Sequence, residues 1–216
     1  WVAFLDSDDL WLPRKLEAQL AALRESRAAW SYTALALVDE GGRPIPFRAG
    51  GFRALSGHIL PQLLAMEAEA TMSTLMVSRA LLEEVGGFDE GLWMRPDLDL
   101  VFRLAARAPV VAVPQVLTHL REHPTRITAA APSPHALTCL VYERFLARER
   151  DPALRRMARE KCAVLLTDGA MHEARIGHRA RAVRLLARSL RYRPLPLRWG
   201  RALASVGLRL LGRRDP

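Results

Sequence analysis

Three aspartates, Asp6, Asp8 and Asp9, stand close together near the start of the sequence. They follow the apolar residues 1–5, which predict a buried strand in a parallel sheet. Ligands of open α/β sheets bind at the carboxyl ends of strands, and carboxylates there suit Mg²⁺ or Mn²⁺, ions that can neutralise a diphosphate. The alternative is that the aspartates only favour the positive N-terminus of the helix that Pro13 begins.

A second group of polar residues lies between residues 86 and 99. Gly86 and Gly87 end a predicted helix, and Phe88 is expected to fill the core. Asp97 lies close to the start of the next helix, where capping alone could explain an aspartate. Asp99 stands two positions later and faces another direction, so the two aspartates need not share a role.

A third group is the segment THLREHPT at residues 118–125. If residues 116–120 form a strand, His119 and Arg121 point to the same face. His123 follows two positions later. A single histidine is more often an ordinary surface or core residue than a ligand, so this segment gains weight only in combination with the other two.

The elements that must position these residues alternate between strands and helices up to about residue 120, which predicts a layered α/β fold. After residue 134 strand signals vanish and helical patterns follow one another. The predicted strands are 1–5, 29–38, 71–77, 110–113 and 116–120, the last two broken by Pro114; the predicted helices are 13–27, 58–66, 78–85, 97–107, 135–149, 152–173 and 176–192, with an irregular loop at 43–57 and a cationic stretch at 197–214.

Four segments in this order resemble the motifs of family 2 glycosyltransferases with the GT-A fold, over about residues 1–128. LDSDDLWLPRKLEAQ resembles their Asp-x-Asp segment, STLMVSRALLEEVGGFDEGL their acceptor-side segment, PDLDLVFRLA their Glu-Asp helix start and THLREHPTRIT their late Arg/His segment. The resemblance implies an incomplete GT-A-like, Rossmann-like mixed α/β sheet with flanking helices at residues 1–130. An arginine-rich, all-helical extension would follow at 131–216.

The resemblance also implies roles for individual residues. Asp97 would be the base that deprotonates the acceptor hydroxyl in an inverting displacement, while a divalent metal stabilises the leaving diphosphate. Asp6 and Asp8 would meet the ribose and the metal. The implied donor-side set is Asp6, Asp8, Asp9, Arg121 and His123, with Asp6, Asp8 and His123 as metal ligands; the implied acceptor-side set is Gly86, Gly87, Phe88 and Asp99.

The sequence departs from the family pattern in two places. Pro96 stands where the family usually has a glutamate, and proline offers neither an N–H nor a carboxylate, which predicts altered acceptor positioning or base geometry. The family's first strand–helix units, which hold the nucleotide base, would lie before Trp1. We therefore expect a C-terminal portion that lacks roughly 80–90 residues of such a domain, has unpaired sheet edges and holds a nucleotide poorly by itself.

Charge is divided unevenly along the 216 residues, whose net charge is +9. Residues 1–143 carry 13 basic and 17 acidic side chains (net −4), and residues 144–216 carry 19 and 6 (net +13). An arginine-rich amphipathic tail suits peripheral contact with a membrane, or it is a helical hairpin with solvated arginines. No nucleic-acid-binding motif accompanies the charge, so nucleic acid is not an expected partner.

The cysteines, the lack of long apolar runs and the N-terminal residues indicate where the protein is expected in the cell. Cys139 and Cys162 lie in helical stretches without ligand spacing, which implies neither a disulfide framework nor a zinc site. No apolar run is long enough to span a bilayer, and the start lacks the features of a signal peptide, so we expect a cytoplasmic protein, peripheral at the inner face of the membrane if the tail binds there.

Three functions are compatible with these patterns. The leading prediction is a metal-dependent, inverting glycosyltransferase that moves a sugar from a nucleotide-diphosphate donor to a glycan or lipid-linked envelope acceptor. The alternative is a non-catalytic remnant whose cationic tail binds a membrane or an anionic partner. The third and least favoured is an arginine-rich nucleic-acid binder, whose affinity would fall steeply with salt.

Overall fold

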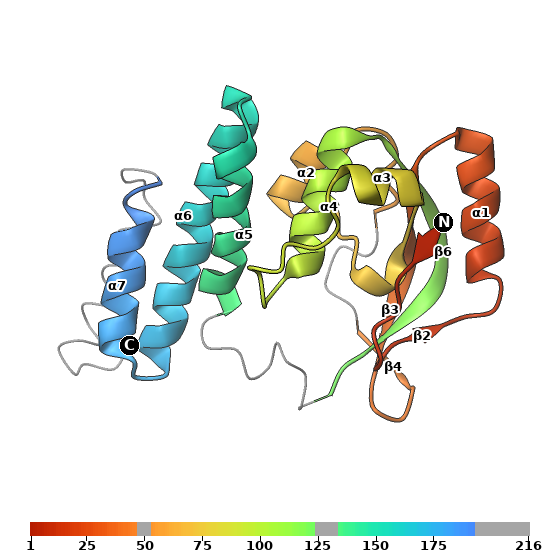
Figure 1. Ribbon diagram of the computed structural model, residues 1–216. Helices are drawn as coiled ribbons and strands as arrows, with labels where there is room; N and C mark the ends of the chain where they lie inside the picture. The colour runs from red at the N-terminus through yellow and green to blue at the C-terminus, as the bar shows by residue number, and fades with distance from the viewer. Residues whose placement is uncertain (47–52, 124–133, 193–216) are drawn as a thin grey trace. The chain divides into compact units, whose positions relative to one another are not determined.

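The structure of the chain is a computed structural model that describes residues 1–46, 53–123 and 134–192. The chain divides into two compact units, residues 1–129 and 130–216 (Figure 1). The domain boundary predicted between residues 130 and 131 lies outside the described residues.

The first unit is built on a mixed sheet with the strand order β1-β5-β3-β6-β2. Its centre is the parallel pair of β3 (Trp30–Val38) and β6 (Val110–Arg121). All other pairings are antiparallel: β1 (Val2–Ala3) with β5 (Leu75–Val77), β5 with β3, β4 (Pro44–Ile45) with β3, and β2 (Leu10–Trp11) with β6. The predicted mixed α/β sheet with flanking helices is confirmed.

The opening strand is shorter and less buried than predicted. Residues 1–5 were expected to form a buried strand in a parallel sheet, but only Val2 and Ala3 are in β1, and they pair antiparallel with β5. Among the described residues β1 lies at the edge of the sheet. Trp1 and Leu5, on either side of β1, are about half exposed, at 55% and 48%.

Pro114 does not end the strand in which it lies. β6 runs from Val110 to Arg121, with register shifts against β3 that leave Pro114 and Gln115 without partners in the ladder. A bulge of this kind accommodates a residue that has no N–H, and Pro114 is exposed there. The two predicted strands at 110–113 and 116–120 are therefore one strand.

Among the described residues of the first unit, four helices flank the sheet: α1 (Lys15–Ser26), α2 (Leu60–Ala65), α3 (Arg79–Glu84) and α4 (Pro96–Arg107). Figure 1 shows α1 on one side of the sheet and α2 to α4 on the other. The core between the sheet and these helices contains fully buried side chains, among them Trp30, Tyr32, Leu100, Phe102 and Leu104. Residues 72–74, predicted as the first part of a strand, form a short 3₁₀ helix, η1 (Met72–Thr74), directly before β5.

The second unit is helical wherever it is described. It consists of α5 (Pro134–Arg148), α6 (Pro152–Arg175) and α7 (Arg179–Ser189), as the sequence predicted. The Asp151 carboxylate caps α6 by accepting hydrogen bonds from the backbone N–H groups of Ala153 (2.7 Å) and Leu154 (3.1 Å). Cys139 and Cys162 are free and buried between α5 and α6. The predicted cationic stretch 197–214 lies outside the described residues.

No helix in residues 1–46, 53–123 or 134–192 has the length and apolar character needed to cross a membrane.

Candidate active site

The three clustered aspartates lie in a turn between β1 and β2, here called the acidic loop (residues 6–9). The backbone N–H of Asp9 donates to the carbonyl oxygen of Asp6 at 3.1 Å, which closes the turn. Asp6 is exposed, while Asp8 and Asp9 are half-buried. The loop thus presents carboxylates at the end of the opening strand, as the sequence predicted.

The end of β6 brings His123 to this loop. The His123 Nε2 lies 3.0 Å from Oδ2 of Asp8, although the two residues are 115 positions apart in the sequence. The side chain of His123 is 19% exposed and that of Asp8 39% exposed, so both border solvent. A carboxylate and an imidazole from different elements therefore meet at one point.

Asp97 lies in the first turn of α4, close enough to the acidic loop to interact electrostatically with Asp6. Although Asp6 is exposed, its partial desolvation by the surrounding protein raises its pKa, and the carboxylates of Asp9, Asp97 and Asp8 raise it further. Burial also raises the pKa of Asp97, against the guanidinium of Arg95 and the backbone N–H groups of Leu98 and Asp97, which lower it. The acidic loop, His123 and Asp97 thus belong to one electrostatic neighbourhood.

Pro96 is compatible with the position of Asp97. It is the first residue of α4, where a proline costs no hydrogen bond because the first N–H groups of a helix have no partner within it. Arg95, directly before it, adopts a left-handed backbone with φ of 59°. The carboxylate of Asp97 then lies at the helix N-terminus, where the helix dipole favours negative charge.

The Asp99 side chain points to the interior. It is fully buried, and its Oδ2 accepts a 2.8 Å hydrogen bond from Nε of Arg103 in a salt bridge within α4. Arg103 Nη1 in turn donates to the carbonyl oxygen of Val85 at 2.6 Å. Through Arg103, Asp99 therefore connects α4 to the end of α3. The buried ion pair gives Asp99 a structural role in place of the acceptor contact predicted for it.

Gly86, Gly87 and Phe88 follow α3 and lead back towards the acidic loop. The glycines have φ angles of 83° and 64°, a left-handed conformation that L side chains rarely adopt. Phe88 was expected in the core, but it is 42% exposed, and its ring packs edge-on against that of Phe4, 5.7 Å between centroids. Because Phe4 lies two residues before Asp6, this segment borders the acidic loop.

The donor set suits a divalent ion shared with a substrate. No group of three histidine, cysteine or carboxylate side chains in the described part of the chain could by itself hold a metal ion. Asp8 and His123 nevertheless place an oxygen and a nitrogen ligand together, and phosphate oxygens and water commonly complete the shell of Mg²⁺ and Mn²⁺. Arg121 Nε is buried without an acceptor among the described residues, which leaves a donor for an anion.

Behind the acidic loop lies a buried polar network that sequence reasoning missed. Ser73 of η1 is fully buried and binds both Asp6 and Asp9. Lys15, 2% exposed, donates to Gln19 Oε1 at 2.6 Å and lies 4.3 Å from the ring centroid of Trp11. Burial lowers the pKa of Lys15 to about 8. The i,i+4 spacing of Lys15 and Gln19 signalled their contact, whereas nothing in the sequence singled out Ser73.

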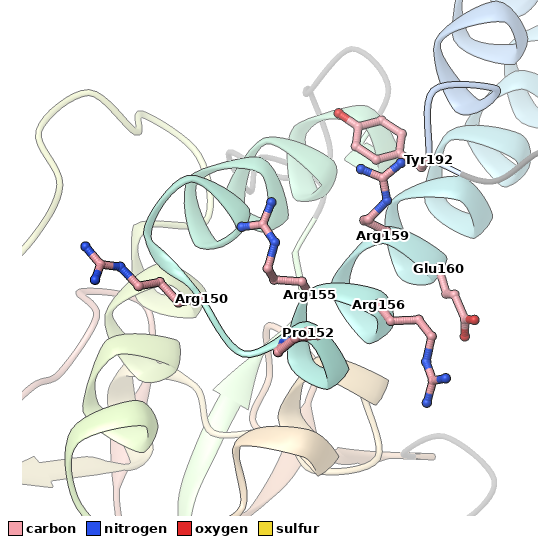
Figure 2. Close-up of a pocket in the computed structure, with 7 residues that line it drawn as sticks. All are labelled: Arg150, Pro152, Arg155, Arg156, Arg159, Glu160 and Tyr192. Carbon is pink, nitrogen blue, oxygen red and sulfur yellow. The ribbon is translucent and has the colours of Figure 1, made fainter.

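A separate hollow of about 500 Å³ opens in the second unit, and it is cationic. It is lined by Arg150, Pro152, Arg155, Arg156, Arg159, Glu160 and Tyr192. Figure 2 shows Arg159 beside the Tyr192 ring, while Arg150 and Arg156 extend to different sides. Arg159 Nη2 donates to the Arg191 carbonyl oxygen at 2.9 Å. Because these guanidinium groups do not converge, the hollow has the character of a basic surface and not of a reaction centre.

The geometry of the first unit thus defines a GT-A-like domain with carboxylates and a histidine at the ends of its strands. Comparison of the sequence with known families agrees: it matches the family described as "Glycosyltransferase like family 2" over residues 1–136, more than half of the chain. The chain belongs to this family, and the resemblance drawn from its motifs is confirmed.

Relatives with curated descriptions support the same assignment. An "Uncharacterized glycosyltransferase" of Rickettsia felis is 30% identical over 121 residues, which are 56% of this chain and 19% of that protein. TuaG of Bacillus subtilis, described as a putative teichuronic acid biosynthesis glycosyltransferase, is 47% identical over 45 residues, 21% of this chain and 18% of its own length. The matched part of this chain therefore spans about a fifth of the length of these relatives.

Solved structures show the same fold. Residues 1–349 of TarS from S. aureus, crystallised with UDP-GlcNAc, match with a TM-score of 0.62 and 17% identity, over 96% of this chain and 61% of that one. A longer TarS structure matches with a TM-score of 0.58 and 16% identity, over 97% and 36% of the two chains.

Proposed function

We propose that this chain carries the catalytic centre of a glycosyltransferase that uses a nucleotide-diphosphate sugar. The observation that carries the proposal is the meeting of Asp8 with His123 in an acidic region whose electrostatics include Asp97. A donor of this class is supported by the UDP-GlcNAc bound to TarS, whose fold this chain shares. The description of TuaG as a putative teichuronic acid biosynthesis glycosyltransferase supports a glycan acceptor, and we propose an envelope glycan or a lipid-linked one.

In this proposal Asp97 is the general base. Its carboxylate accepts the proton of the acceptor hydroxyl while that oxygen forms a bond to the anomeric carbon of the sugar. The bond between the anomeric carbon and the diphosphate breaks, and the nucleoside diphosphate leaves with the electron pair. One displacement of this kind inverts the anomeric configuration. The raised pKa of Asp97 makes its carboxylate a stronger base than an ordinary exposed aspartate.

The donor side is assigned to the acidic loop and to the end of β6. Asp8 and His123 would hold Mg²⁺ or Mn²⁺, which when bound offsets the charge that develops on the leaving diphosphate. Asp6 would meet the ribose or the metal, and Arg121 Nε would donate to a phosphate oxygen. On the acceptor side Gly86, Gly87 and the exposed ring of Phe88 would border the glycan.

The second unit is basic, and we propose that it contacts an anionic membrane surface. Exposed arginines surround the hollow of α6, and residues 144–216 have a net charge of +13. Peripheral contact with an anionic membrane would hold the catalytic unit near a lipid-linked acceptor.

The test uses the full-length protein and measures release of UDP from a UDP-sugar with and without Mn²⁺. Asp97→Asn keeps the shape of the side chain but removes the base, so kcat should fall about 100-fold or more while the affinity for UDP and Mn²⁺ stays unchanged. The matched control is Asp39→Asn, in the turn between β3 and β4, where the side chain accepts from the Arg43 backbone N–H, away from the acidic loop. Unchanged turnover in Asp97→Asn would refute the assignment of the base.

A further inference from the structure

Ser73 connects the acidic loop to the rest of the sheet through four hydrogen bonds. Its Oγ accepts the backbone N–H of Asp6 at 3.0 Å and donates to Oδ2 of Asp9 at 2.5 Å. Its carbonyl oxygen accepts the indole N–H of Trp11 at 2.8 Å and the hydroxyl of Thr118, on β6, at 3.3 Å. One fully buried residue thus contacts both ends of the loop, β2 and β6.

Asp9 carries the connection on to the end of β6. While its Oδ2 accepts from Ser73, its Oδ1 accepts the backbone N–H of Arg121 at 3.1 Å. The two donors lie 64 and 112 positions away in the sequence. Both carboxylate oxygens therefore bind neutral groups of two other elements, which is the environment of a structural aspartate and not of a metal ligand.

These bonds fix the distance between the two candidate metal ligands. Asp8 is the neighbour of Asp9, and His123 is two residues beyond Arg121. Since consecutive Cα atoms are about 3.8 Å apart, joining Asp9 to Arg121 leaves Asp8 and His123 little freedom to separate. Their contact at 3.0 Å agrees with this restriction.

We propose that Ser73 and Asp9 form a clamp that holds the acidic loop against the end of β6 and so positions Asp8 and His123 for the ion and the diphosphate. This inference rests on the proposed function. Under it, Ser73 and Asp9 are positioning residues, and the direct cofactor contact predicted for Asp9 is replaced by a supporting role. Supporting residues of this kind set the affinity of a metal site without touching the ion.

The experiment compares two buried serines in the full-length protein. Ser73→Ala removes the two Oγ hydrogen bonds, to Asp6 and Asp9, and so weakens the clamp. Ser31→Ala removes a hydroxyl that is equally buried but accepts from Gln19 Nε2, at 3.0 Å, instead of binding the acidic loop. Calorimetry with Mn²⁺ and UDP should show affinity about 10-fold or more lower in Ser73→Ala and unchanged in Ser31→Ala. Equal affinities in both variants would overturn the proposal.

A second pair of variants separates positioning from ligation by Asp9. The amide side chain introduced by Asp9→Asn keeps one oxygen that can accept from the Arg121 N–H, and its NH₂ group can donate to Ser73 Oγ. The affinity for Mn²⁺ should therefore fall much less in Asp9→Asn than in Asp8→Asn. If both variants lose affinity to the same extent, Asp9 is a ligand and its role as a clamp is wrong.

A readout without metal keeps the clamp testable on its own. The clamp predicts that hydrogen–deuterium exchange at the Arg121 amide becomes faster in Ser73→Ala than in Ser31→Ala, in protein free of metal and nucleotide. If the parent protein binds no Mn²⁺ but this exchange difference is found, the metal assignment fails and the clamp stands. If the Arg121 amide exchanges equally in the two variants, the clamp is refuted whatever the metal does.

Discussion

At the scale of single residues, burial makes the ionised form of the Asp97 carboxyl less favourable. Its pKa is raised above 3.8, so the folded protein binds this proton more tightly than the unfolded chain does. The resulting stabilisation is complete below pH 3.8 and is lost as pH rises through the raised pKa. Ionising Asp97, as its proposed role as the base requires, thus lowers the stability of the fold at neutral pH.

The first prediction follows from this sign. Asp97→Asn, which has no proton to lose, should unfold at a higher temperature than the parent protein at pH 7, and the difference should disappear on acidification below about pH 4. Thermal unfolding followed by circular dichroism across this range measures it. A variant that is less stable than the parent at pH 7 would contradict the burial of Asp97.

Lys15 gives a second prediction with the opposite sign. Its pKa is lowered by burial from 10.5 to about 8, so between these values the unfolded chain holds a proton that the folded protein does not. Stability contributed by Lys15 therefore rises from about pH 8 to pH 10.5. The unfolding temperature of the parent, relative to Lys15→Met, should increase over this interval; a constant difference would show that Lys15 is not buried.

Which residues could be predicted from the sequence depended on where they stand in their elements. Asp6, Asp8 and His123 stand at the ends of strands, and Asp97 at the start of a helix, where topology brings side chains together. Ser73 could not be found in this way, because its role depends on partners 64 and 67 positions away. The pairing of Asp99 with Arg103 had an i,i+4 signal that would have favoured a structural role.

At the scale of elements, β6 shows how the site is tied to the centre of the sheet. It pairs with β3 from end to end, apart from the bulge, and carries Thr118, Arg121 and, two residues past its end, His123. Periodicity predicted the long strands and helices well. It missed β2 and β4, which have only two residues each. It also divided β6 at Pro114, because the bulge that accommodates this proline arises only from pairing with β3.

The bulge in β6 gives the third prediction. Pro114→Ala should change the free energy of unfolding by at most about 1 kcal/mol, because residue 114 takes no part in the ladder. Val113→Pro, one position earlier and paired with Thr33, should lose about 2 kcal/mol or more by removing an N–H from the ladder. Urea denaturation of both variants measures the two values. Similar losses in both would contradict the bulge.

At the scale of the whole molecule, the two units differ in charge. The first carries the site in an acidic neighbourhood, and the second is helical in its described part and basic. The uneven charge is plain in the sequence, but charge could not identify the anionic partner, because arginines suit a membrane surface and a solvated helix equally well.

The fourth prediction addresses that partner. Arg150→Gln combined with Arg156→Gln should lower the affinity for phosphatidylserine vesicles about 30-fold, since each basic residue near an anionic surface contributes about 1 kcal/mol to binding. Cosedimentation with the vesicles measures this affinity. The control combines Arg24→Gln with Arg79→Gln, two exposed arginines of the first unit. Equal losses in both double variants, or binding to neutral vesicles, would argue against a specific basic surface.

We propose that Asp8 and His123 together hold the ion that offsets the charge of the leaving diphosphate. Anomalous X-ray scattering from crystals of the full-length protein grown with Mn²⁺ and UDP would locate this ion. We expect a manganese peak within about 2.0–2.4 Å of both Asp8 and His123 Nε2, with UDP oxygens in the same shell. A peak bound by other residues, or UDP bound with Asp8 and His123 still paired to each other and no manganese between them, would contradict it.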